Sequence, residues 1–212
     1  WFAARGITAF VLIYRLPGEG WRDRMNAPLA DAQRAMRLIR AHAPEWRIDP
    51  RRVAAMGFSA GGHLCADLAT RFARKTYEPV DAADALDSRP MLAAPIYPVI
   101  SMDPAIAHSG SRSLLLGSDP TAEAAREHSP DQQVTAATPP CFLLHAEDDK
   151  TVPVENSIRF RAALKAAGVP VEAHIFEKGG HGFGWGRQTQ GKPVHVWPEL
   201  YLAWARTHGL LG

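Results

Sequence analysis

Ser59 stands at the centre of the segment G-F-S-A-G, residues 57–61 of a 212-residue chain. The segment fits the G-x-S-x-G pattern, in which a tight turn between a strand and a helix exposes the serine hydroxyl as a nucleophile. The glycines permit the strained backbone of such a turn. In that turn the N–H of Ala60 faces the oxyanion that forms when the serine attacks a carbonyl group. The alternative interpretation is a glycine-rich helix entry with a capping serine.

A serine hydroxyl is a weak nucleophile at neutral pH, so a base must take its proton and an acid must orient that base. His181 lies in the segment G-G-H-G-F, whose glycines allow its imidazole to turn back toward the strand ends. Three acids, Glu147, Asp148 and Asp149, follow an apolar run that ends in His145. The order serine, acid, histidine matches the triads of doubly wound hydrolases. We therefore predict His181 as the base, with His145 as its main rival. A histidine at a strand end more usually bonds a neighbouring backbone group.

The apolar pattern predicts the elements that must position these residues. Short apolar runs bounded by glycine, proline or polar residues indicate five strands, at 7–14, 52–58, 91–97, 141–145 and 171–176, the first two of them buried. Helical spacing predicts four amphipathic helices, over 29–43, 64–72, 160–167 and 197–204. The alternation favours an α/β fold, with a mostly parallel sheet and helices on both faces. Because ligands gather at the carboxyl ends of such strands, the candidate residues are expected to meet there.

Charge and composition exclude several classes of protein. The chain has 24 basic and 22 acidic residues and a net charge of +2, with no block of like charges, so no nucleic-acid partner is expected. Its hydrophobic content of 46% suits one domain over residues 1–212, with 74–90 and 101–138 as excursions from the sheet. The longest apolar stretches are far shorter than the roughly 20 residues of a membrane-spanning helix, so no membrane partner is expected either.

No metal or cofactor site is predicted. The chain has no H-E-x-x-H, no C-x-x-C and no G-x-x-x-x-G-K-[ST] segment. His63 and Asp67 form a helical i, i+4 pair of ligand type, but such a pair is usually accidental. Cys65 and Cys141 are interpreted as buried thiols rather than a disulfide framework.

Taken together, these segments resemble the α/β-hydrolase superfamily. More narrowly, they resemble its esterase/lipase-like branch, which includes acetyl esterases acting on acetylated sugars and xylan. That branch is often grouped with dienelactone-hydrolase-like and prolyl-oligopeptidase-like domains. The resemblance runs through Y-R-L-P after the first predicted strand and I-D-P before the second, then through G-F-S-A-G-G-H-L, D-D-K-T-V-P-V-E-N-S and G-G-H-G-F-G.

The resemblance implies roles for individual residues. Ser59 matches the nucleophile, His181 the general base and Asp149 the orienting acid, the last through the pattern D-x-x-V-P. Asp148 is the second choice for the acid. Two aromatic residues beside the base, Phe183 and Trp185, are candidates for an apolar wall against a sugar ring, or for packing under the loop.

The implied activity is hydrolysis of small carboxylic esters through an acyl-enzyme, with acetyl groups on carbohydrates as the preferred substrate. The expected partner is a small-molecule or oligosaccharide ester. A peptidase of the prolyl-oligopeptidase-like type and an inactive fragment are the alternatives. The resembled family begins with three further strands and a loop rich in His and Gly that supplies a second oxyanion donor. We therefore expect these residues to be the C-terminal portion of a longer fold, with an open sheet edge through which copies could associate.

Overall fold

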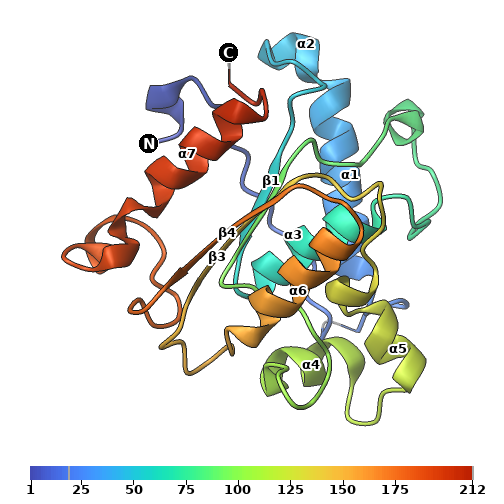
Figure 1. Ribbon diagram of the computed structural model, residues 1–212. Coiled ribbons are helices and arrows are strands. Elements are labelled where there is room, and N and C mark those ends of the chain that lie inside the picture. The colour runs from blue at the N-terminus through green and yellow to red at the C-terminus, as the bar shows by residue number, and fades with distance from the viewer. Residues whose placement is uncertain (19, 212) are drawn as a thin grey trace.

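The computed structural model describes residues 1–18 and 20–211, apart from the side chains at positions 186 and 187. Its centre is a parallel sheet whose strands lie side by side in chain order (Figure 1). Helices lie between successive strands. Parallel strands need such crossover connections, because the chain must return to the end of the sheet at which each strand begins. The strands are β1 (Ala55–Phe58), β2 (Ala93–Ile96), β3 (Cys141–Ala146) and β4 (Val171–Phe176).

Helices cover both faces of this sheet (Figure 1). On one face α7 (Trp197–Thr207) packs aromatic side chains against Phe142 and Leu144 of β3. On the other face α3 (Ala60–Arg71) and α6 (Glu155–Ala166) pack against Leu143, since successive residues of a strand point to opposite faces. α1 (Ala27–Ala41) packs on α3. The predicted α/β architecture, with a parallel sheet between helices, is therefore confirmed.

Shorter elements complete the chain. The predicted excursion 101–138 forms two helices and a 3-10 turn, and 74–90 holds a single 3-10 turn. These elements and the remaining ones are η1 (Ala3–Arg5), α2 (Ala43–Trp46), η2 (Ala82–Ala85), α4 (Ser109–Leu116), α5 (Ala122–Glu127), η3 (Pro130–Gln132), η4 (Gly186–Thr189) and η5 (Pro193–Val196). None of the helices within the described residues has the length and apolar character to cross a bilayer.

One predicted strand is wrong. Residues 7–14 form no regular element, and Val11 and Ile13 are 90% and 94% exposed. A β-branched, apolar run becomes a strand only when a neighbouring strand takes up its backbone N–H and C=O groups. Among the described residues β1 pairs with β2 alone, and nothing pairs with 7–14. The sheet of the described chain therefore has four strands rather than about five.

Both cysteines lie in the core, as the sequence predicts. Cys65 and Cys141 are buried and free. Burial raises the pKa of Cys65 to about 12, with a smaller opposing effect of the hydrogen bond from the backbone of Ala94. These thiols therefore serve the packing between α3 and the sheet.

Candidate active site

Ser59 occupies the turn between β1 and α3, and its backbone is strained. Its φ of 54° and ψ of −117° lie where side-chain-bearing residues are rarely found. The Ser59 N–H donates to the carbonyl of Ile96 at 3.0 Å, and the Ser59 carbonyl accepts from the N–H of His63 at 3.0 Å. The turn is thus held from β2 on one side and from the first turn of α3 on the other.

The turn depends on two glycines. A Cβ on Gly57 would lie 1.9 Å from the carbonyl oxygen of Gly61, and a Cβ on Gly62 would lie 2.9 Å from Cα of Pro98. At Gly61 a Cβ would meet nothing within 4 Å. The pattern attributes the tight turn to the glycines that flank the serine, whereas the structure places the steric requirement on Gly57 and on Gly62.

Three side chains from three different segments meet at the carboxyl ends of the strands. Oγ of Ser59 lies 2.9 Å from Nε2 of His181, and Nδ1 of His181 lies 2.7 Å from Oδ2 of Asp149. An ionised carboxylate only accepts hydrogen bonds, so Nδ1 of His181 carries the proton and Nε2 accepts from the serine hydroxyl. Chemically, this arrangement is able to take the proton from Ser59 and later return it to a leaving group.

The carboxylate of Asp149 is buried and ionised. Its side chain has 0% exposure. Burial by itself would raise the pKa of Asp149, but four donors outweigh that effect and hold the pKa well below its usual range. Oδ1 accepts two backbone N–H groups, both at 2.9 Å. The donors are His145, the N–H of Val152, His181 and the N–H of Thr151.

The neighbouring Asp148 has a different set of partners. Its Oδ1 accepts the N–H of Gly180 at 2.7 Å and that of Gly179 at 2.8 Å, and these bonds lower the pKa of Asp148. Asp148 therefore fastens the backbone of the loop that carries His181, while Asp149 faces the ring itself. A Cβ on Gly179 would lie 2.9 Å from Cβ of Ala146, so the loop also packs closely on the end of β3.

His145, the rival candidate for the base, is buried beside the acid. Its Nε2 lies 3.0 Å from the carbonyl oxygen of Val152 and 3.3 Å from Oδ2 of Asp149. Its Nδ1 lies 2.8 Å from Oγ of Ser157 on α6. The histidine that bonds the hydroxyl of Ser59 is thus His181, and His145 bonds a neighbouring backbone carbonyl.

Ala60 is the first residue of α3, so its N–H has no acceptor within the helix. It lies at the positive end of the helix dipole, where a developing negative charge is stabilised. Phe183 is only 2% exposed and packs under the loop, with its ring 4.6 Å from that of Tyr97. Trp185 is half-buried and contacts the rings of Trp1 and Trp197.

Tyr97 is a residue of this site that the sequence analysis missed. It follows β2 with a φ of 35°, which is unusual for an aromatic residue. Its ring lies edge-on to that of His181, with centroids 5.1 Å apart. Burial raises the pKa of Tyr97. In the sequence, the signal for Tyr97 is an aromatic residue at the end of the predicted strand 91–97. That strand lies between the strand before Ser59 and the strand before Asp149.

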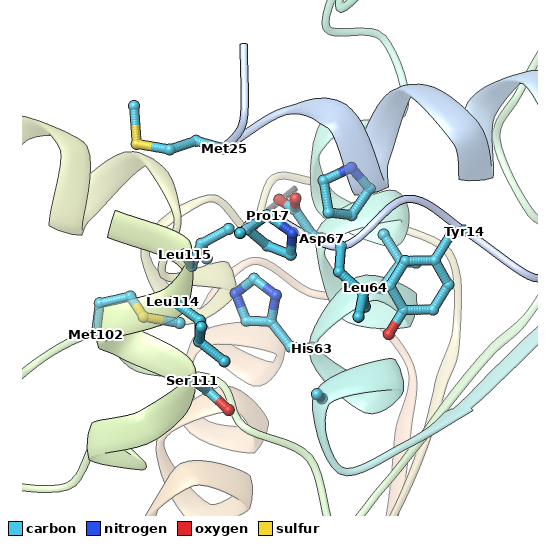
Figure 2. A pocket seen from close by; sticks show the side chains of 14 residues that line it. Tyr14, Pro17, Met25, His63, Leu64, Asp67, Met102, Ser111, Leu114 and Leu115 are labelled. Carbon is cyan, nitrogen blue, oxygen red and sulfur yellow. The ribbon is translucent and has the colours of Figure 1, made fainter. Parts of the chain in front are cut away.

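A cavity of about 280 Å³ has Ala60 among its lining residues. Figure 2 shows His63, Leu64 and Leu115 among the side chains around it. The cavity touches the site through Ala60, and neither Ser59 nor His181 lines it. His63 bonds the carbonyl oxygen of His128 through Nε2 at 2.9 Å rather than the serine. Most of the other lining residues are apolar, among them Leu16, Pro17, Met25, Leu64, Met102, Leu114 and Leu115.

No metal site is visible in the part of the chain that the structure describes, where no three His, Cys, Asp or Glu side chains form a cluster suited to an ion.

Comparisons with known proteins cover most of the chain. The sequence model of the BD-FAE family matches residues 2–164, a range that includes Ser59 and Asp149 and ends before His181. The chain is 39% identical over 181 residues to endo-1,4-beta-xylanase B of Butyrivibrio fibrisolvens. It is 36% identical over 198 residues to an acetylxylan esterase of Xylanibacter ruminicola. These alignments cover 85% and 88% of this chain but 28% and 36% of the two relatives. The chain thus spans about a third of their length.

A solved structure is similar over the whole chain. The acetyl ester-xyloside bifunctional hydrolase from Caldicellulosiruptor lactoaceticus is 40% identical, with a TM-score of 0.91. The match covers 100% of this chain and 75% of that one. The α/β-hydrolase fold implied by the sequence motifs is thereby confirmed.

Proposed function

The chain belongs to the BD-FAE family, and on that premise we propose that it hydrolyses carboxylic esters, with small acyl groups on carbohydrates as substrates. Two relatives support the substrate class by their names, an acetylxylan esterase and an acetyl ester-xyloside hydrolase. The observation that carries the proposal is the pair of hydrogen bonds that link Oγ of Ser59 to His181 and His181 to Asp149.

In the proposed first step, Oγ of Ser59 attacks the ester carbonyl carbon while Nε2 of His181 takes the hydroxyl proton. The carbonyl oxygen becomes an oxyanion, which faces the N–H of Ala60 at the start of α3. Asp149 stabilises the imidazolium that forms. When the intermediate collapses, His181 gives its proton to the oxygen of the sugar alcohol, which leaves, and the acyl group stays on Ser59.

In the second step a water molecule attacks the acyl-enzyme. His181 takes a proton from that water as the bond to the acyl carbon forms. Collapse of the second tetrahedral intermediate returns the proton to Oγ of Ser59 and releases the carboxylic acid. In this proposal Asp148 holds the loop of His181, and Trp185 is the aromatic side chain beside it that keeps exposed surface for a sugar ring, because Phe183 is buried.

Burst kinetics with p-nitrophenyl acetate test the proposal. The parent should release one equivalent of p-nitrophenol quickly and then turn over, because the acyl-enzyme accumulates. A fluorophosphonate probe should label the parent and fail to label Ser59→Ala. Equal hydrolysis by the parent and Ser59→Ala would refute the assignment of the nucleophile. A parent that neither shows a burst nor takes the probe would indicate an inactive fragment.

The natural substrate class is tested by a pair of compounds. An acetylated xylo-oligosaccharide and an acyl-peptide offer the same acyl group on an alcohol and on an amine. The proposal expects the ester to be hydrolysed faster, measured as kcat/KM. Faster cleavage of the acyl-peptide would favour the peptidase alternative instead.

A further inference from the structure

A second serine–histidine pair faces the same carboxylate oxygen as the first. Oδ2 of Asp149 lies between Nδ1 of His181 at 2.7 Å and Nε2 of His145 at 3.3 Å. Nδ1 of His145 in turn lies 2.8 Å from Oγ of Ser157. The side chains of His145 and Asp149 are 0% exposed. Asp149 therefore contacts two histidines. His181 is partly exposed and bonds Ser59, whereas His145 is completely buried.

The partners of His145 determine where its proton lies. The carbonyl oxygen of Val152, 3.0 Å from Nε2, only accepts hydrogen bonds, so Nε2 carries a hydrogen. The same nitrogen lies 3.3 Å from Oδ2 of Asp149, so the carboxylate is a second and longer contact of that N–H. In the neutral ring, Nδ1 is then the acceptor for the hydroxyl of Ser157. Contacts on both nitrogens thus fix the tautomer and the orientation of His145.

Few charged groups face Asp149. The titratable groups around it are His145 at the end of β3, His181 in the loop after β4, and Tyr97 after β2, which acts at longer range. Among the described side chains, no lysine or arginine forms an ion pair with this carboxylate. A buried charge without an ion pair depends on its hydrogen-bond donors. Among the described side chains, His181 at 2.7 Å and His145 at 3.3 Å are the two that place a ring nitrogen beside Oδ2 of Asp149.

We propose that His145 is a positioning residue for the proposed ester hydrolysis: its Nε2–H fixes Oδ2 of Asp149 and shares the charge of that oxygen with His181. The proposal rests on the proposed function. Without this donor Oδ2 is held by His181 alone, while Oδ1 keeps its two backbone N–H donors. The less firmly held Oδ2 stabilises the His181 imidazolium less in the transition state. The loss acts on proton transfer and leaves substrate binding almost unchanged.

Three substitutions at position 145 distinguish the effect of the N–H donor on catalysis from the effect of side-chain volume. His145→Leu keeps a similar volume and removes the donor. His145→Gln places its amide N–H near the position of Nε2, and His145→Asn places one near Nδ1, where it faces Ser157 instead. The matched control is His174→Leu on β4, because His174 bonds Glu172 and has no contact with Asp149.

The assay is p-nitrophenyl acetate hydrolysis per fluorophosphonate-titrated site, followed over pH. We expect His145→Leu and His145→Asn to lower kcat about ten- to a hundredfold, as loss of a hydrogen bond to a charged group implies. KM should change by less than about twofold, since uniform binding is untouched. The acidic limb of the kcat/KM profile should move to lower pH, because an imidazolium with a less firmly held carboxylate gives up its proton more readily. His145→Gln should recover most of the rate, and the control should match the parent.

Equal rates per titrated site for the Gln and Asn variants would overturn the proposal, because only the Gln amide reaches the carboxylate. A parent-like kcat for His145→Leu would overturn it as well. If the Leu variant does not fold, the comparison of Gln with Asn still decides. A parent without a burst or labelling would refute the proposed function, whereas an active parent with unresponsive position-145 variants would refute this inference alone.

Discussion

Replacing Asp149 with asparagine should disable the site without changing its shape. Oδ1 of Asp149 accepts two backbone N–H groups, so the amide oxygen of the asparagine is expected to take that place. The amide nitrogen then takes the place of Oδ2, 2.7 Å from Nδ1 of His181. Two donors would face each other there. The clash is relieved if the proton of His181 moves from Nδ1 to Nε2.

That shift of the proton removes the base. Nε2 of His181 lies 2.9 Å from Oγ of Ser59, and once protonated it can no longer accept the hydroxyl proton. The imidazolium of the transition state also loses the only carboxylate that contacts its ring in the described structure. The same exchange in the chymotrypsin triad lowers kcat about 10⁴-fold, which corresponds to about 5 kcal/mol at 1.36 kcal/mol per tenfold. We expect a loss of that order for Asp149→Asn.

Asp148→Asn is the matched control, because it makes the same change one residue away. The amide oxygen of an asparagine can still accept the N–H groups of Gly179 and Gly180, so we expect a loss of less than about tenfold. The assay is steady-state hydrolysis of p-nitrophenyl acetate by both variants, corrected for the folded fraction from near-ultraviolet circular dichroism. The reasoning fails if Asp149→Asn keeps more than a tenth of the parental kcat, or if the two variants lose equally.

Three further predictions concern folding and stability. Gly57→Ala should prevent correct folding, because its Cβ would lie 1.9 Å from the Gly61 carbonyl oxygen, whereas Gly61→Ala meets nothing within 4 Å and should fold. Soluble yield and thermal unfolding check this pair, and a stable Gly57→Ala variant would contradict it. The folded-state pKa of Asp149 is lowered, so its carboxylate stabilises the fold above about pH 4, the unfolded value, and that contribution is lost as the pH falls further. Urea unfolding between pH 6 and pH 3 should therefore show a steeper loss for the parent than for Asp149→Asn, and parallel curves would count against it. Phe142→Ala, at 0% exposure between β3 and α7, should lower the free energy of unfolding by about 3–5 kcal/mol, and the exposed Ile158→Ala should change it by less than about 1 kcal/mol. Similar denaturation midpoints for these two variants would show that the α7 face is not the main core.

The apolar pattern was enough to predict most of the fold. Period and length of the apolar runs identify the strands 52–58, 91–97, 141–145 and 171–176. β2 and β3 are buried along their whole length between two helical layers, as near-continuous apolar runs indicate. β1 and β4 are only partly buried. The same pattern failed at 7–14, where the composition is equally apolar. Apolar composition reports a tendency toward burial, whereas a strand also needs a neighbour for its backbone groups, and the described chain supplies none there.

The sequence by itself also determined the order of the chemical groups: a serine in a strand-to-helix turn, an acid after a later strand and a histidine in a glycine loop. It placed all of them at strand ends, and the structure brings Ser59, Asp149 and His181 within hydrogen-bond distance, while their catalytic roles stay a prediction. Only the tertiary structure assigned different partners to the two adjacent aspartates. It also placed His145 on the far side of the same carboxylate oxygen. The reason is physical: side-chain type and spacing are local properties of the chain, but a hydrogen bond joins segments that only folding brings together. Asp148 and Asp149 follow β3 in one turn, and only the folded backbone of that turn decides which carboxylate faces an imidazole and which faces a loop backbone.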